Sequence, residues 1–157
     1  MKRQSLTFHL YSTDAAKRLD PKWKKLEPLL KESARCVLEE ELESIGKLRL
    51  NVILNSDEEL RELNVRVLNH DYFTDIITFE IDREEHTLSA ELYISLERAR
   101  ENAHTYKASI RNELARLVIH GMLHLAGYGD KLATEKKRMQ RKERYFLACV
   151  QKNITID

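Results

Sequence analysis

The longest regular run of apolar positions in the chain lies between Ile110 and Gly127. Apolar side chains recur there at three- and four-residue steps and cover two faces of a helix: Ile110, Leu114, Leu117, Val118, Met122 and Leu125 on one, and Ala115, Ile119, Leu123 and Ala126 on the other. A helix that is apolar nearly all round is normally buried. Gly127 suits the left-handed residue that ends a helix, so the pattern predicts a buried helix that ends there.

Four shorter stretches have the alternation, or the content of apolar and β-branched residues, that is typical of strands. They are Leu6–Tyr11, Lys47–Leu54, Asp75–Ile81 and Leu88–Ile94. Only the polar loop Asp82–His86 separates the third stretch from the fourth, so these two are expected to pair antiparallel. Helical segments separate the others, which favours parallel pairing.

The other helices are predicted from their start signals. Asp20 followed by Pro21 suits a helix start. Pro28 either kinks that helix or begins its main part. The apolar stripe of this helix extends to Ile45. A capping box of Ser56 and Glu59 predicts a helix from Asp57 to about Val67. Ser95 can cap the helix that follows the fourth strand, and Ser109 can cap the apolar helix. A last helix is predicted at about residues 134–150. The order of elements predicts an α/β (α+β) fold in which about five helices cover a small mixed four-stranded sheet, with the apolar helix near the centre.

The composition is that of a globular protein. The chain has 157 residues, of which 42% are hydrophobic and 34% charged, with a net charge of +1. This length predicts a single domain over residues 1–157, and the composition argues against a disordered or membrane protein. Two cysteines are too few for a disulfide framework, and without a signal peptide a cytoplasmic location is expected. Because the net charge is near zero, any nucleic-acid surface must come from local basic patches.

Two histidines stand out on the apolar helix. His120 and His124 are one turn apart and project from the same side, and Asp130 follows the glycine stop. A histidine on an apolar helix is usually hydrogen-bonded within the core, whereas two at this spacing can share one divalent ion, and the local pattern leaves both interpretations open. If a metal is bound, His120, His124 and Asp130 are its predicted ligands.

The segment His120-Gly-Met-Leu-His-Leu-Ala-Gly-Tyr128 resembles the signature of the YbeY family. A second block, Leu63-Asn64 followed by His70-Asp71-Tyr-Phe-Thr-Asp-Ile-Ile-Thr-Phe79, is similar to another stretch of that family, so the resemblance covers most of the chain from about Leu48. It implies a metal-dependent single-strand endoribonuclease that acts in ribosomal RNA maturation and ribosome quality control. Its implied partners are single-stranded or ribosomal RNA and the ribosome or assembly factors, with neither a membrane nor DNA expected.

Two positions depart from the family pattern. Asp130 stands where the family has a third histidine, and Leu68 stands where it tends to have an arginine. A carboxylate can ligate zinc, but it cancels one unit of metal charge. We therefore expect a weaker Lewis acid and more tolerance of harder ions such as manganese. The role of the missing arginine is open.

The resemblance implies one divalent ion per chain, with zinc as the expected metal and a metal-activated water as the attacking group. Catalysis is assigned to that water alone. Glu113, two turns before His120, is a speculative candidate for orienting a ligand, with a surface salt bridge as the alternative. Glu91 is expected to have a structural role or to orient a ligand.

Three further residues are expected at the site, each with a packing or turn-forming role as the alternative. Thr74 and Asp75 are expected in its wall, and Tyr128 is expected at its mouth.

The last predicted helix contains the most basic window of the chain. Its candidate RNA-binding residues are Lys136, Lys137, Arg138, Arg141 and Lys142, with Glu135 and Glu143 counted as opposing charges on the same outer face. Because the window follows Asp130 directly, we expect it to border the metal site and to contact phosphate. A solvated helix face is the alternative.

Two other functions remain open. The protein could be a non-catalytic ribosome-assembly factor whose metal is structural, in which case His9, His70, His86 or His104 would have to supply a fourth ligand. A metal-dependent peptidase is less favoured, because Gly121 occupies the place of the general-base glutamate in the His-Glu-x-x-His motif.

Overall fold

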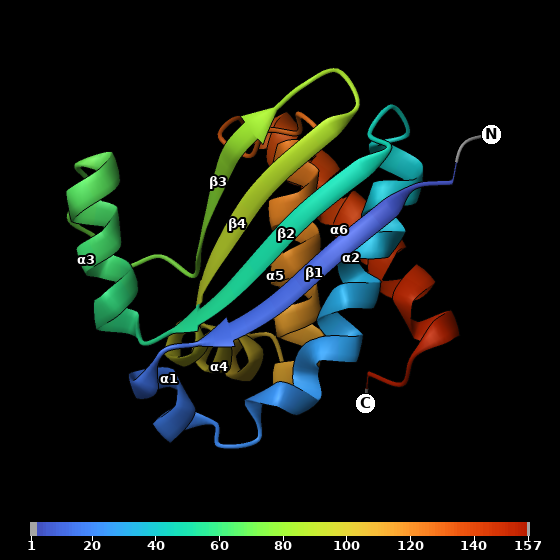
Figure 1. Ribbon diagram of the computed structural model, residues 1–157. Helices are drawn as coiled ribbons and strands as arrows, with labels where there is room; N and C mark the ends of the chain where they lie inside the picture. Colours follow the sequence, from blue (N-terminus) through green and yellow to red (C-terminus); the bar gives the residue numbers. More distant parts are fainter. Residues whose placement is uncertain (1–2, 157) are drawn as a thin grey trace.

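The computed structural model describes residues 3–156 and contains a four-stranded sheet and helices that cover it (Figure 1). The elements in chain order are β1 (Ser5–Ser12), α1 (Asp14–Leu19), the 3-10 helix η1 (Trp23–Leu26), α2 (Glu27–Glu41), β2 (Lys47–Asn55), α3 (Asp57–Leu68), β3 (Ile76–Arg83), β4 (Thr87–Ser95), α4 (Leu96–Thr105), α5 (Ile110–Leu125) and α6 (Ala133–Asn153). The predicted mixed α/β class is confirmed. No helix within residues 3–156 is both long enough and apolar enough to cross a membrane.

The sheet has the order β1-β2-β4-β3. β1 pairs with β2, and β2 with β4, in parallel, whereas β3 and β4 pair antiparallel as the short loop between them predicts. β3 is therefore an edge strand, and Figure 1 shows α3 standing beside it. This arrangement brings the segment between α3 and β3 to one end of the sheet.

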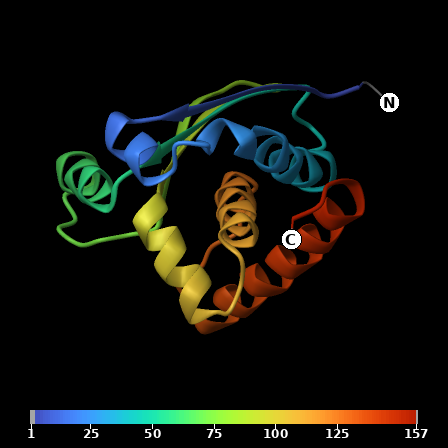
Figure 2. The ribbon, with the colours of Figure 1, turned by 90° about the horizontal axis from the view of Figure 1, so that it is seen from below.

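The alternation along β2 and β4 separates the two faces of the sheet. Leu50 and Val52 of β2 and Leu92 of β4 are buried with their same-face neighbours under the helices, whereas Asn51 and Glu91 pair on the opposite face. Figure 2 shows α5 enclosed by the sheet, α2, α4 and α6. The apolar residues of α5 are buried on both of its faces, as the all-round pattern predicts.

Gly121 lies where α5 approaches the sheet most closely. A Cβ at this position would lie 2.7 Å from Leu92 Cδ2 and 3.1 Å from Thr78 Oγ1. Only a residue without a side chain fits this approach without displacing its neighbours. The close contact keeps the following turn of α5, which carries His124, against β3 and β4.

The start of the second helix differs from the prediction at Asp20 and Pro21. Thr13 caps α1 by accepting a hydrogen bond from the Ala16 amide at 3.2 Å, and Asp20 is the residue that ends α1. The main helix begins at Glu27 with Pro28 in its first turn, which agrees with the second of the two roles predicted for Pro28. The caps at Ser56, Ser95 and Ser109 are confirmed.

Candidate metal centre

α5 and the turn that follows it bring three potential ligands together. The Nε2 atoms of His120 and His124 lie 3.0 Å apart, as their one-turn spacing requires. Gly127 adopts φ = 100°, which ends the helix and turns the chain back. Asp130 Oδ2 then lies 3.2 Å from His124 Nε2 and 3.3 Å from His120 Nε2. Within residues 3–156 these three form the group of histidine, cysteine and acidic side chains that could hold a metal ion.

The spacing of the ligand atoms suits a small divalent ion. Ligands about 2.0–2.1 Å from a tetrahedral zinc lie about 3.3 Å from one another. The three observed separations, 3.0–3.3 Å, are close to this value. The three side chains are partly exposed, with Asp130 the most open at 39%. The group is therefore pre-arranged, with one side open to solvent.

Both histidines are oriented through Nδ1. His120 Nδ1 lies 2.6 Å from Glu143 Oε2, and His124 Nδ1 lies 2.8 Å from the carbonyl oxygen of Tyr128. A carboxylate and a carbonyl only accept, so each Nδ1–H donates and Nε2 is left as the nitrogen that can bind a metal. Metal-ligating histidines are commonly oriented in this way.

Glu143 has a role that the sequence did not predict. Its expected place among the outer charges of the last helix is wrong, because only 5% of the residue is exposed. A signal was present, because Glu143 lies four residues after Met139 and three before Phe146, a spacing that puts it on the same helical face as these two apolar residues. An acid on an apolar helical face needs a partner, and His120 is that partner.

Glu113 is buried rather than part of a surface salt bridge, and it does not belong to the candidate ligand group. Its carboxylate accepts hydrogen bonds from Arg116 Nε and Nη2, both at 2.7 Å, and from Asn102 Nδ2 at 3.0 Å. Arg116 Nη1 also donates to Glu143 Oε1 at 3.1 Å. Glu113 is thus linked to His120 only through Arg116 and Glu143.

Arg116 holds the two acids in place. Burial by itself would lower the pKa of Arg116, but its hydrogen bonds and ion pairs with Glu113 and Glu143 outweigh this and raise the pKa. The guanidinium therefore stays charged and compensates both buried carboxylates.

The ligand group lines a cavity of about 550 Å³. Thr74 and Asp75 lie in its wall, as expected, together with residues from the end of α3, from β3 and from the turn after α5: Asn64, Leu68, His70, Tyr72, Ile76, Ile77, Thr78, Glu80, Leu125 and Lys131. The cavity therefore extends from the candidate ligand group to the loop between α3 and β3.

Tyr128 and Glu91 lie away from the cavity. The Tyr128 hydroxyl donates to Glu41 Oε2 at 2.7 Å, so its ring points toward α2 rather than to the mouth of the site. Burial would raise the pKa of Glu41, but hydrogen bonds from Lys142 and Tyr128 lower it. Glu91 accepts from Asn51 and Tyr93 on the sheet face opposite α5. Of the two roles expected for Glu91, the structural one therefore fits, because the sheet separates it from the histidines.

The five basic residues proposed for RNA binding, Lys136, Lys137, Arg138, Arg141 and Lys142, do not line this cavity. Lys142 Nζ pairs with Glu41 at 2.8 Å, and the Arg138 guanidinium lies 4.8 Å from the centre of the Tyr128 ring. Lys137 and Arg141 border a separate surface hollow on α6. The lysine that does line the cavity is Lys131. For the five residues of α6, contact with RNA outside the cavity stays a prediction.

The other histidines do not complete the ligand group. His70 lines the same cavity, but its Nδ1 lies 3.0 Å from the Tyr72 hydroxyl, and the ligand cluster within residues 3–156 contains only three members. His9 lies on the open sheet face and His104 at the exposed end of α4. Within residues 3–156 the group therefore has three candidate protein ligands, and all three line the cavity.

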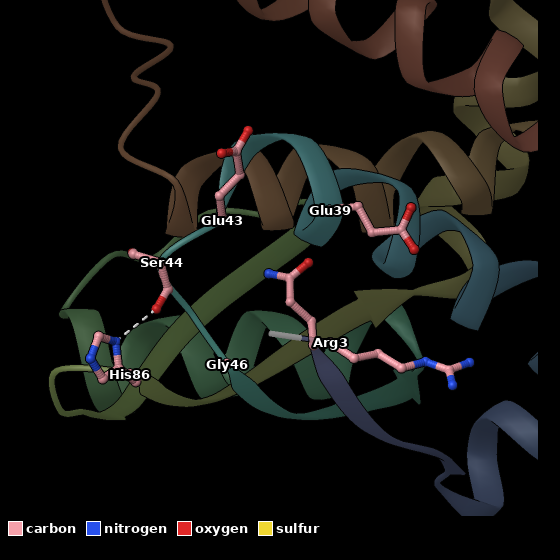
Figure 3. A pocket seen from close by; sticks show the side chains of 7 residues that line it. Arg3, Glu39, Glu43, Ser44, Gly46 and His86 are labelled. Atoms are coloured by element: carbon pink, nitrogen blue, oxygen red, sulfur yellow. Dashed lines mark hydrogen bonds between the residues drawn. The ribbon is translucent and has the colours of Figure 1, made fainter. Parts of the chain in front are cut away.

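A second hollow, of about 780 Å³, lies where the β3–β4 loop meets the start of β1 and the end of α2 (Figure 3). His86 Nδ1 is 3.1 Å from the Ser44 carbonyl, and in Figure 3 the side chains of Arg3 and Glu43 point in different directions. Its polar groups do not converge on one point. The chemistry is therefore assigned to the smaller cavity that contains the histidines.

The fold and the site together place the chain in the class of small mixed α/β proteins that have a candidate three-ligand metal site on and just after a buried helix. The model of the family described as Endoribonuclease YbeY matches residues 13–151. The chain belongs to this family.

Individual relatives agree with this assignment. An Endoribonuclease YbeY of Cytophaga hutchinsonii is 42% identical over 101 residues, which are 64% of this chain and 71% of the relative. One of Phocaeicola vulgatus is 37% identical over 140 residues, which are 89% of this chain and 96% of the relative. The solution structure of a Thermotoga maritima protein matches with a TM-score of 0.60 and 30% identity, over 92% of this chain and 89% of that one. The similarity thus extends over both sequence and fold.

Proposed function

We propose that this protein is a metal-dependent endoribonuclease that cleaves single-stranded RNA during the maturation of small-subunit ribosomal RNA. The observation that carries the proposal is the convergence of His120, His124 and Asp130 on one point in the wall of an open cavity. Family membership supports RNA as the substrate, since the relatives are named endoribonucleases. Zinc is the proposed ion, because two nitrogens and one oxygen at this spacing suit it.

A divalent ion held there would supply Lewis-acid chemistry, lowering the pKa of a water and polarising a phosphoryl oxygen. The residues around the ion would orient its ligands and position the RNA phosphate. Glu143 and the Tyr128 carbonyl fix the two imidazoles, and Arg116 holds Glu143 in place by a hydrogen bond. Lys131 brings a positive charge to the same cavity and is suited to attract a phosphate.

The same geometry weighs against a purely structural metal. Structural zinc sites are normally closed by four protein ligands, whereas this group has three within residues 3–156 and opens to a cavity. A peptidase of the His-Glu-x-x-His type is disfavoured, because Gly121 packs against Leu92 where that class needs a glutamate.

The cellular setting follows from the proposed activity. An enzyme of ribosomal RNA maturation works in the cytoplasm with the ribosome or its assembly factors, and a role in ribosome quality control belongs to the same setting. These partners are proposed from the family resemblance. The basic residues of α6 are the proposed contacts for the RNA backbone beyond the cavity.

The first experiment is metal analysis of untagged protein by mass spectrometry, for the wild type and the Asp130→Ala and His124→Ala variants. Glu85→Ala is the matched control, since the side chain of Glu85 is 88% exposed. We expect about one zinc per chain in the wild type and control, and loss of metal and of single-stranded RNA cleavage together in the two site variants.

Equal metal content in wild type and Asp130→Ala would show that Asp130 is not a ligand. Normal zinc content without cleavage of any single-stranded RNA would favour the non-catalytic assembly factor instead.

A further inference from the structure

An exposed aromatic pair, from the loop between α3 and β3, lines the cavity that contains the candidate metal ligands. The Tyr72 and His70 rings stack, with centroids 5.3 Å apart and planes 19° from parallel. Tyr72 is 55% exposed, although a tyrosine of this size is ordinarily more buried. Both residues line the cavity that also contains His120, His124 and Asp130.

The loop that presents this pair is held from both sides. The buried Asn64 side chain donates to the Tyr72 carbonyl at 3.1 Å, and the His70 amide donates to the Asn64 carbonyl at 3.2 Å. Asn69 takes the left-handed conformation, at φ = 57°, that turns the chain out of α3. Arg61 pairs with Asp71 at 2.8 Å. These contacts fix the position of the rings before any ligand binds.

Neighbouring Phe73 is engaged differently. The guanidinium groups of Arg61 and Arg98 lie 5.6 Å and 5.3 Å from the centre of its ring. Phe73 thus anchors the loop to α3 and α4 through cation–π contacts. Tyr72, unlike Phe73, lines the cavity, and its ring is open to solvent.

The charged side chains that line the cavity belong to the candidate ligand group, follow it in the chain or are paired with neighbours. Lys131 directly follows Asp130 and brings a positive charge to the cavity. Asp75 accepts from Asn102 and lies 3.8 Å from Arg116, and Glu80 accepts from Arg83, so both acids are engaged with neighbours. A phosphate is therefore favoured at the ligand group, and an uncharged planar group is favoured at Tyr72 and His70.

We propose that Tyr72, backed by His70, is a stacking platform for one unpaired nucleobase of the RNA strand whose phosphate lies at the metal-binding group. The proposal rests on the proposed endoribonuclease function. Aromatic rings bind unpaired bases by their flat faces and tolerate any sequence. Bases within a duplex are already stacked and paired, so the platform selects single strands.

The test uses an oligouridine that contains one 2-aminopurine, whose fluorescence is quenched when it stacks. Zinc-loaded wild type, Tyr72→Ala, Tyr72→Phe and the control Tyr106→Ala are mixed with it in a stopped-flow instrument. Tyr106 is a matched control because it is 68% exposed at the end of α4. Metal content and circular dichroism establish that each variant is folded and loaded.

We expect the wild type, Tyr72→Phe and the control to quench the fluorescence. For Tyr72→Ala, the protein concentration that gives half-maximal quenching should rise about ten- to a hundred-fold. For cleavage of the same strand, KM should rise in Tyr72→Ala by a similar factor while kcat changes little. Equal quenching by Tyr72→Ala and wild type, or none by the wild type, would overturn the platform. Quenching that depends on Tyr72 without any cleavage would keep the platform and contradict the proposed function.

Discussion

The two histidines of α5 have the same side chain but different supports. His120 is held by a buried carboxylate, whereas His124 is held by a backbone carbonyl in the turn that follows its own helix. A carboxylate on Nδ1 makes the imidazole more basic and so strengthens Nε2 as a ligand. We therefore expect the orientation and ligand strength of His120 to depend on a side chain of α6. The orientation of His124 should depend on the shape of the turn after α5.

Glu143→Gln tests the first dependence. The amide keeps the size of the side chain but removes its charge, so we expect zinc affinity to fall about 10- to 100-fold. Competition with a chromogenic chelator measures the affinity, with Glu85→Gln as the exposed control. Unchanged affinity would mean that packing alone orients His120.

At the scale of elements, the site depends on where α5 ends. Ala126 is the last residue with helical dihedral angles, and Gly127 takes φ = 100°. The turn then places the Tyr128 carbonyl beside His124 and the Asp130 carboxylate beside both histidines. One backbone conformation therefore sets two features of the ligand group.

Gly127→Ala should strain this turn, because a side chain at positive φ costs about 1–2 kcal/mol. Nothing lies within 4 Å of the added Cβ, so the strain is conformational rather than a clash. For a chain of this size we expect the melting temperature to fall by about 2–6 °C and zinc affinity to weaken. Gly46→Ala is the control, since Gly46 lies outside the left-handed region. A Gly46 variant that lost as much stability would contradict this explanation.

At the scale of the whole molecule, the helices form a shell around α5. α2 and α6 come from opposite halves of the sequence and pack against each other and against α5. Their contact includes the pair Lys142–Glu41 and the thiols of Cys36 and Cys149, whose sulfur atoms lie 3.2 Å apart. Because α6 carries Glu143, the packing of α6 also keeps the support of His120 in place.

Oxidation of the two thiols probes this packing. Burial raises the pKa of the Cys36 thiol well above its usual range, so we expect the partly exposed Cys149 to react first. Treatment with diamide should form an intramolecular disulfide, seen as the loss of two hydrogens by mass spectrometry. The bond would close a loop of 113 residues and raise the free energy of unfolding by up to about 4 kcal/mol. Cys149→Ser should abolish the effect, and intermolecular dimers as the main product would argue against the α2–α6 contact.

Local periodicity was sufficient to predict much of this protein. The four strands, the buried helix, its glycine stop and the grouping of His120, His124 and Asp130 all depend on neighbours within ten residues along the chain. Hydrophobic burial repeats with the geometry of each element, so such features are visible in the sequence. The pairing of β3 with β4 was predictable for the same reason, because their connection is short.

Other features were decided only by the tertiary structure. Glu143 lies 23 residues from His120, and Glu41 lies 101 residues from Lys142. The spacing of Glu143 from Met139 and Phe146 indicates a buried position, but no local pattern shows which residue is the partner of a buried acid. The face on which Glu91 lies, opposite α5, likewise depends on how the sheet is assembled. The helix start predicted at Asp20 and Pro21 was wrong, because Thr13 caps α1 and Asp20 is the residue at which α1 ends. Long-range partners set these outcomes, since a buried charge is stable only where the fold supplies its counterpart.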